Sequence, residues 1–193
     1  MTKKHFLLIA AITLSITANQ AQNISKDCYR GFFDGGCTIG VGDYPFNRLE
    51  VNTSHGYQIT PSFFVGGGAG MHFMSSYETS SMVIPLDVRK SKVDIPLFVN
   101  ARFNMSKGHY VPFLDFKAGK YVTYNGGLYM NISLGCRIAM GEKNAVNIHV
   151  GYTTEQLEFE TFYKFVSSSS MDYLRKGTLR TTEGLVARIG YEF

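Results

Sequence analysis

The sequence has no apolar segment long enough to cross a bilayer as a helix. Its main apolar run extends only from Phe6 to Ile16, whereas a transmembrane helix needs ~20 such residues. Mean hydropathy is near neutral, as expected when lipid-facing and lumen-facing residues alternate along membrane strands. These features exclude a helical membrane protein and leave open a protein that crosses with strands.

Charged residues are also scarce, at 18% of the chain, and the formal net charge is only +4. Lys3 and Lys4 supply two of these charges, so the remaining excess is too small to predict nucleic-acid binding. The three cysteines, Cys28, Cys37 and Cys136, cannot all pair with one another. Cys37 and Cys136 fall on apolar strand faces, where we expect them to act as small hydrophobic residues.

The N-terminus has the layout of a secretory signal peptide. Lys3 and Lys4 precede the apolar run, and the short segment Thr17–Ala21 follows it. A basic start, an apolar centre and small residues before the cleavage site are typical of this signal. We predict that residues 1–21 are removed and that residues 22–193 form one domain.

The chain ends on an alternating strand, Glu183–Phe193, whose last residue is aromatic. Soluble domains rarely end in this way, because a terminal sheet edge is usually blunted or frayed. The strand resembles the C-terminal assembly signal of outer-membrane barrels, in which the last strand closes against the first. The apolar face of this predicted signal consists of Leu185, Ala187, Ile189, Tyr191 and Phe193.

Apolar and polar residues alternate with a period of two along most of the chain. Each alternating segment is about as long as a tilted membrane strand, which takes roughly nine to eleven residues, and an even strand number is typical of bacterial barrels. The sequence therefore predicts an all-β fold, an eight-stranded antiparallel up-and-down transmembrane β-barrel. The predicted strands are Phe33–Val41, Leu49–Ile59, Phe63–Phe73, Val93–Phe103, Pro112–Gly119, Leu128–Ile138, Val146–Thr153 and Glu183–Phe193.

The connections between these strands differ in length at the two ends of the predicted barrel. Three short ones, Thr60–Pro61, Met105–His109 and Met140–Asn144, fall on one side, and the two longest, Ser75–Lys92 and Thr154–Arg180, fall on the other. Short periplasmic turns and longer extracellular loops are typical of outer-membrane barrels. We therefore predict that both long connections face outside. Phe and Tyr residues near the strand ends fit the aromatic girdles of a membrane interface.

The last long connection looks like additional strand. Its apolar residues lie at even positions up to Tyr152 and at odd positions from Leu157 to Phe165. Because a one-residue slip exchanges the two faces of a strand, we predict a bulge or the exit from the bilayer within residues 153–156. Beyond that point we expect a β-hairpin with an exposed edge and its tip at Ser167–Asp172. A disordered loop is the alternative.

The polar strand faces carry acidic and basic residues that should point into the lumen. An eight-stranded barrel is just wide enough for side chains to fill it, and an unpaired buried charge is costly. We therefore predict a closed, ion-paired core, with a selective pore or a catalytic cluster as alternatives. The predicted lumen residues are Asp34, Glu50, Asp94, Asp115 and Glu192 with Arg102, Lys117, Arg137 and Arg188.

Candidate catalytic and metal sites are weak. His55 and His109 are not spaced with a serine and an acid in a way that predicts a triad. His72 and His149 could meet in the lumen, but two histidines alone are poor evidence for a metal. The glycine-rich segment Gly66–Gly70 lies mid-strand with no helix after it, so it lacks the context of a phosphate loop. We predict no catalytic, metal-binding or cofactor-binding residues.

At the level of whole segments, the chain resembles the small outer-membrane β-barrel proteins, often labelled porin-like, that are common in Bacteroides and relatives. The resemblance covers nearly all of the mature chain. It implies the fold, the outer membrane of a Gram-negative bacterium, and contact with outer-membrane lipid and the barrel assembly machinery. It implies no established activity, because this family is mostly defined by architecture. The segments that carry it are Tyr29–Asp34, Thr38–Asp43, Thr53–Ile59, Phe63–Gly68, Ile95–Phe98, Pro112–Asp115, Gly126–Tyr129 and Ala145–Ile148.

For function, we expect a protein that is not an enzyme and that acts as a surface-exposed structural or interaction protein. Its partner would be an extracellular protein that binds the loops Ser75–Lys92 and Thr154–Arg180. A narrow porin-like channel is the first alternative, and an outer-membrane lipid-modifying enzyme is the second.

Overall fold

The computed structural model describes residues 28–78, 86–141, 144–167 and 170–193, and the predicted signal peptide lies outside this part of the chain. The described residues fold as strands joined by turns and loops. No helix among them could span a membrane.

Eight long strands form a closed antiparallel barrel, which confirms the predicted fold class. The short strands β4 (Tyr77–Glu78), β5 (Leu86–Arg89) and β6 (Lys92–Asp94) lie in the connection between β3 and β7. The long strands are β1 (Cys28–Val41), β2 (Arg48–Thr60), β3 (Phe63–Met74), β7 (Pro96–Asn104), β8 (Tyr110–Tyr121), β9 (Leu128–Ala139), β10 (Ala145–Ser167) and β11 (Ser170–Glu192).

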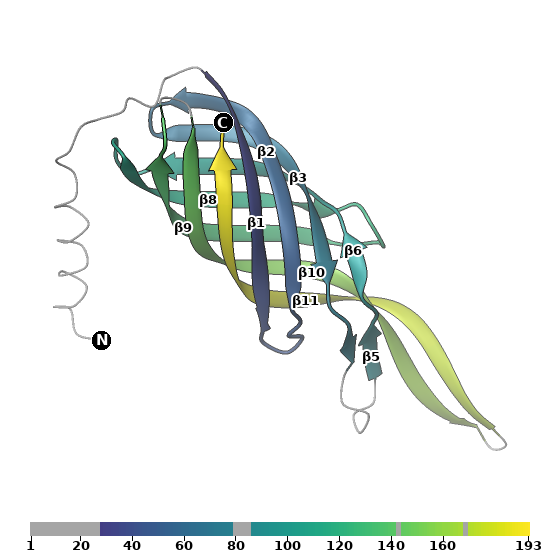
Figure 1. Ribbon diagram of the computed structural model, residues 1–193. Coiled ribbons are helices and arrows are strands. Elements are labelled where there is room, and N and C mark those ends of the chain that lie inside the picture. Colours follow the sequence, from purple (N-terminus) through teal and green to yellow (C-terminus); the bar gives the residue numbers. More distant parts are fainter. Residues whose placement is uncertain (1–27, 79–85, 142–143, 168–169) are drawn as a thin grey trace, which may run out of the picture.

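The last strand closes the barrel against the first. β11 pairs with β1 from Phe32↔Glu192 to Val41↔Glu183 and with β10 on its other side. Figure 1 shows the C-terminus at one end of the barrel and the β10–β11 hairpin projecting from the opposite end. The strands thus follow one another around the wall, as in an up-and-down barrel.

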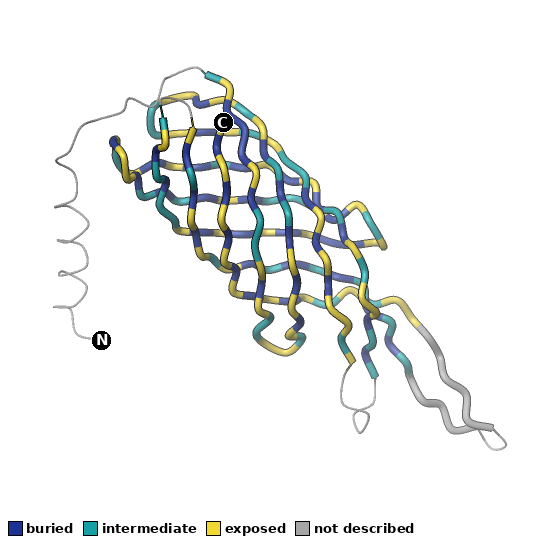
Figure 2. Tube along the Cα trace, viewed as in Figure 1, coloured by how far each residue is buried: buried dark blue, intermediate teal, exposed yellow. Residues whose placement is uncertain are grey.

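Burial alternates along each strand, as Figure 2 shows for the whole wall. In β2, for example, Glu50, Asn52 and Ser54 are buried, whereas Leu49 lies 64% exposed. Successive side chains of a strand point to opposite faces, so the polar residues fill the inside and the apolar residues cover the outside. This arrangement inverts the one found in a soluble barrel.

Several observed strands are longer than predicted, and one predicted strand is interrupted. β1 begins at Cys28 and not at Phe33. The predicted strand Val93–Phe103 is split into β6 and β7, although both parts pair with β3. The break lies beside Pro96, which has no N–H to donate to a neighbouring strand.

The β10–β11 hairpin is confirmed, although β11 already begins at Ser170, within the predicted tip. Of the two alternatives predicted within residues 153–156, the bulge is wrong and the exit from the bilayer stays a prediction. The two strands keep a single register from Ala145↔Glu192 to Ser167↔Ser170. Thr153, Leu157 and Phe159 are all buried. The odd-numbered residues of β10 therefore face inward on both sides of residues 153–156, and only their character changes from polar to apolar. The shift of apolar residues from even to odd positions therefore results from apolar side chains on the inner face, and not from a slip of the strand.

The predicted assembly-signal residues all face outward, and the ring of the last of them, Phe193, packs over Gly31 of β1. The backbone of Phe193 exchanges two hydrogen bonds with Gly31, at 2.9 and 3.0 Å. A Cβ on Gly31 would lie 2.5 Å from the Phe193 ring, and Gly31 is buried although its neighbours on that face look outward. The ring also packs near His55 and Tyr191. A larger residue at this position would have to displace the ring from where it lies.

Candidate functional site

The lumen holds a chain of ion pairs that runs through the barrel. All nine predicted lumen residues expose 3% or less of their surface. Buried charges in such surroundings need oppositely charged and hydrogen-bonding partners. These partners form successive layers from the turn end of the barrel to the hairpin end.

At the turn end, Glu192 joins two arginines. Arg137 Nε donates to Glu192 Oε2 at 2.9 Å, and Arg30 Nη1 donates to Glu192 Oε1. Both arginines come from strands that lie apart in sequence from the C-terminal strand, so the pairing joins β1, β9 and β11 across the lumen. Arg30 was missed in the sequence because the first strand was predicted to begin at Phe33.

The next layer combines ion pairs with aromatic rings. Lys117 Nζ lies 2.9 Å from Asp34 Oδ2 and 3.8 Å from Asp115 Oδ1. Arg102 Nε donates to Asp115 Oδ2 at 2.9 Å. The guanidinium carbon of Arg102 also lies 4.1 and 4.2 Å from the ring centres of Phe32 and Phe113. Cation–π contacts of this kind stabilise a cation that has left water, so this layer fills the lumen with rings as well as charges.

Glu50 is the hub of the central layer. Arg48 Nε donates to its carboxylate at 2.7 Å, and Arg188 Nε donates to its other oxygen. Arg188 also donates to Asn131 at 2.8 Å and to the Tyr129 hydroxyl at 3.2 Å. Two arginines therefore surround a single glutamate, and the remaining N–H groups of Arg188 donate to polar neighbours.

Above the centre, two further ion pairs involve residues that sequence reasoning missed. Arg48 reaches Glu155, which also accepts a hydrogen bond from Tyr121. Arg89 Nη2 lies 2.5 Å from Asp94 Oδ2. The prediction that Asp94 pairs with Arg102, Lys117, Arg137 or Arg188 is therefore wrong. The partner of Asp94 comes from β5, which pairs with β10 at the hairpin end of the barrel.

Apolar and aromatic side chains close the hairpin end of the lumen. A buried cluster combines side chains from strands around the barrel with Phe46, which follows β1 in the first loop. Tyr44 and Tyr77 pack against it from above, and each lies less than 6 Å from the ring of Phe159. The cluster thus covers the ion pairs below it. Its members are Phe46, Met74, Phe98, Tyr121, Tyr129, Leu157 and Phe159.

Asp87 organises the rim above this cluster. Its carboxylate accepts hydrogen bonds from Tyr44 at 3.0 Å, Thr161 at 2.5 Å and Arg180 Nε at 3.1 Å. The Arg180 guanidinium also lies over the Tyr44 ring. Burial and the hydrogen bond to Asp87 raise the pKa of Tyr44 above its usual value, so the phenol stays a donor. Asp87 thereby joins β5, both hairpin strands and the first loop.

Replacing Asp87 with asparagine is expected to loosen the base of the hairpin. A hydrogen bond to a charged group contributes about 1.5–3 kcal/mol, and cleavage of a locally opened segment follows its opening free energy. Trypsin should then cleave after Arg180 about ten times faster than in the unmodified protein. Glu78→Gln, which removes one acidic charge from the same mouth, is the control and should leave the rate unchanged. Equal rates for Asp87→Asn would show that Asp87 does not hold the rim.

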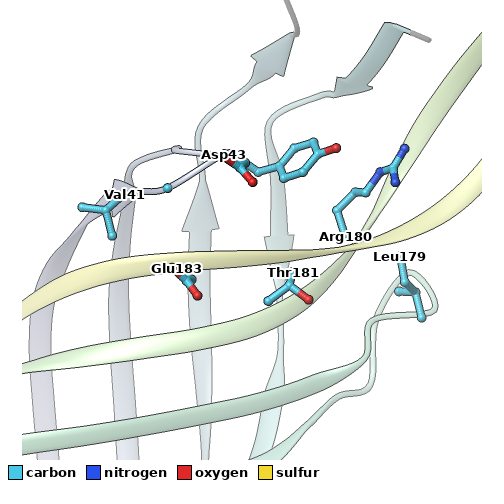
Figure 3. Close-up of a pocket in the computed structure, with 8 residues that line it drawn as sticks. Val41, Asp43, Leu179, Arg180, Thr181 and Glu183 are labelled. Carbon is cyan, nitrogen blue, oxygen red and sulfur yellow. The ribbon is translucent and has the colours of Figure 1, made fainter.

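A pocket of about 520 Å³ lies beside this rim, between the first loop and β11. Figure 3 shows Asp43 of the loop facing the part of β11 that carries Arg180, Thr181 and Glu183. Arg180 points to one side of the strand, and Thr181 and Glu183 point to the other. The lining residues are Val41, Gly42, Asp43, Tyr44, Leu179, Arg180, Thr181 and Glu183.

The histidines lie in separate surroundings. His72 contacts Tyr121 at 2.8 Å and Asn52 at 3.2 Å, whereas His149 lies 3.7 Å from Asp34 in the layer below. His55 lies on the outer wall, where Tyr29 and Thr53 occupy its two ring nitrogens. Among the described residues, no group of three or more potential ligands is arranged to hold a metal ion.

Strand parity could have found three of the missed lumen residues. Arg30 and Arg48 share the even positions of Asp34 and Glu50, and Glu155 continues the odd positions of β10. Each lies just beyond the predicted end of a strand. Arg89 and Asp87 carried no such signal, because β5 belongs to a connection whose path over the barrel mouth depends on the fold.

Comparison with known proteins gives structural neighbours only. No protein-family model and no curated protein matches the sequence. The outer membrane protein W of E. coli, solved by NMR, aligns with 88% of this chain and 100% of its own, at 12% identity and a TM-score of 0.44. The outer membrane protein AlkL, solved by solid-state NMR in lipid bilayers, aligns with 91% of this chain and 94% of its own, at 11% identity and a TM-score of 0.41.

Proposed function

We propose that the protein spans the outer membrane of a Gram-negative bacterium as a closed barrel and binds a partner at the cell surface. Its outer loops and the β10–β11 hairpin form the binding region. The proposal assigns the protein no enzymatic activity: His72 is hydrogen-bonded to Asn52 in the lumen, and His55 is hydrogen-bonded to Thr53 on the outer wall.

The chemistry of the two barrel faces supports the membrane location. Ile39, Val150 and Leu185 each expose more than half of their surface on the outer wall, whereas the charges lie inside. A soluble protein rarely exposes so large an apolar surface. The predicted girdle residues are exposed near the strand ends: Phe33, Tyr57, Phe63, Phe103, Tyr110, Tyr191 and Phe193 at the turn end, with Phe73 and Tyr152 at the other end.

The orientation follows from the connections. The three short turns lie at the end that carries Phe193, and the hairpin and the short strands β4 and β5 lie at the opposite end. Outer-membrane barrels place the short turns in the periplasm. The hairpin would therefore project from the cell surface.

The observation that carries the interaction proposal is the length of the hairpin. β10 and β11 remain paired beyond the last β1–β11 pair, Val41↔Glu183, as far as Ser167↔Ser170. A strand pair that leaves the barrel wall presents a sheet edge outside it. Such an edge can bind an extended segment of another protein through backbone hydrogen bonds.

The filled lumen argues against the channel alternative. The charges are paired in every layer described above, and aromatic rings close the hairpin end. We expect purified protein in planar bilayers to give no steady conductance of porin size. Trypsin added to one side should still cleave after Lys176, which verifies that the protein has inserted. A steady conductance of that size would contradict the closed lumen and favour a channel.

A peptide selection tests the binding proposal. The probe is a phage library of random twelve-residue peptides, selected on the full-length barrel in lipid nanodiscs. The control is the same barrel with residues 160–177 replaced by a short turn. We expect peptides that bind the complete protein and lose binding to the shortened one. Failure to enrich any hairpin-dependent peptide would refute this function.

A further inference from the structure

The first loop leaves a gap beside β11 at the point where the hairpin leaves the barrel. β1 pairs with β11 up to Val41↔Glu183. Gly42 then takes a positive φ of 81°, a conformation that favours glycine, and the chain turns away from β11. Any strand that continued the line of β1 would lie opposite Thr182 and the residues beyond it.

That edge of β11 is open in the described structure, and the other edge of the hairpin is not. β5 already adds to β10 as a third strand, with Thr161↔Asp87 at the centre of the contact. On β11, the residues from Ser170 to Thr182 pair with β10 alone among the described strands. The hairpin therefore already carries an added strand, β5, along β10, and its β11 edge is free to pair with another strand.

The pocket at the base of this edge is acidic. The charge of Arg180 is taken up by Asp87, 3.1 Å away, and by the Tyr44 ring. Asp43 and Glu183 remain, and the neighbour of Glu183 on β10, Tyr152, is a neutral phenol that leaves the carboxylate charge in place. A basic side chain would thus find two carboxylates without a competing cation from the pocket itself.

Side chains on the same face of β11 define a second contact. Leu179, Thr181 and Glu183 alternate with Arg180 and Thr182, and Leu179 is 50% exposed. Directly opposite residues of an antiparallel pair interact most strongly. A residue opposite Leu179 would therefore gain most if it were apolar.

We propose, on the basis of the function proposed above, that this edge binds an extended basic peptide. The peptide lies antiparallel to β11 in continuation of β1. A basic residue opposite Thr181 reaches Asp43 and Glu183, and an apolar residue two positions away covers Leu179. Charge complementarity selects this partner over a neutral or acidic strand.

The test starts from a peptide enriched in the selection described above. Its affinity is measured by fluorescence polarisation for the full-length barrel, for Asp43→Asn/Glu183→Gln and for Glu78→Gln. We expect about tenfold weaker binding to the double variant, as for loss of a partly buried charge contact, and unchanged binding to Glu78→Gln, which carries the same kind of charge change outside the pocket. Glutamine in place of the basic residue of the peptide should cause the same loss.

Backbone pairing is tested separately with N-methylated peptides. Methylation of alternate amides in one register should abolish binding, and methylation in the other register should leave it intact, because only alternate amides of a strand face β11. Equal effects of the two series would overturn the strand addition.

Other outcomes separate the two proposals. Hairpin-dependent peptides that lack basic residues, or that bind the double variant equally well, would overturn this inference and leave the surface-binding function standing. Self-association of the barrel that the peptide does not displace would also overturn it, because a second copy would then occupy the edge.

Discussion

Replacing Arg188 with methionine is expected to lower the free energy of unfolding by about 3–5 kcal/mol. The buried guanidinium contacts Glu50, Asn131 and Tyr129, and its loss leaves half of the Glu50 carboxylate without a cation. Urea unfolding of the barrel in lipid vesicles, followed by tyrosine fluorescence and gel mobility, measures the change. Less than 1 kcal/mol would show that water in the lumen replaces the ion pair.

Two variants make the Arg188 result specific. Arg188→Met/Glu50→Gln should recover part of the loss, because the remaining amide carries no uncompensated charge and Arg48 keeps Glu155 as a partner. Lys120→Met removes an exposed charge from the outer wall and should change stability little, as is usual for surface substitutions. If the double variant has a lower free energy of unfolding than Arg188→Met, the main role of the arginine is packing.

Replacing Gly31 with valine is expected to dislodge Phe193 and open the β1–β11 seam. The new Cβ would lie 2.5 Å from the Phe193 ring. A displaced ring loses its contacts with His55 and Tyr191, and each lost backbone hydrogen bond costs about 1 kcal/mol. The fraction of protein that migrates as a folded, heat-modifiable barrel should fall both in refolding experiments and in isolated outer membranes.

Gly35 provides the matched control for Gly31. It lies on the same face of β1, and a Cβ there would meet nothing within 4 Å. Gly35→Val should therefore fold normally, whereas Gly31→Val/Phe193→Ala should fold as well as Phe193→Ala alone. Normal folding of Gly31→Val would show that barrel closure does not require the contact between Gly31 and the Phe193 ring. The predicted assembly signal would then act without this contact.

Local patterns were sufficient to predict the barrel wall. Leu49 and Glu50 end up on opposite faces because strand side chains alternate, and this relation needs no knowledge of the rest of the fold. Strand ends were less predictable. Residues 28–32 place Phe32 inward and Tyr29 outward, so the apolar–polar alternation fails there although the strand continues.

The partners across the lumen could not be predicted in the same way. Opposite charges in the lumen predict that ion pairs form. Which residues pair depends on barrel diameter and strand stagger, as for Arg30 with Glu192 and Lys117 with Asp34. The rim was least accessible to sequence reasoning. Asp87 reaches Tyr44, Thr161 and Arg180 only because β5 adds to β10, and neither the strand nor its register has a local signature.

The unbroken β10–β11 register has a mechanical consequence. Both strands run from the hairpin into the barrel wall without a bulge, and β11 is also the strand that seals against β1. A pull on a partner strand laid along β11 would act parallel to the strands, so that many backbone hydrogen bonds share the load at once. Such a pull would be carried into the seam between β1 and β11, where the pairs from Val41↔Glu183 to Phe32↔Glu192 would resist it together.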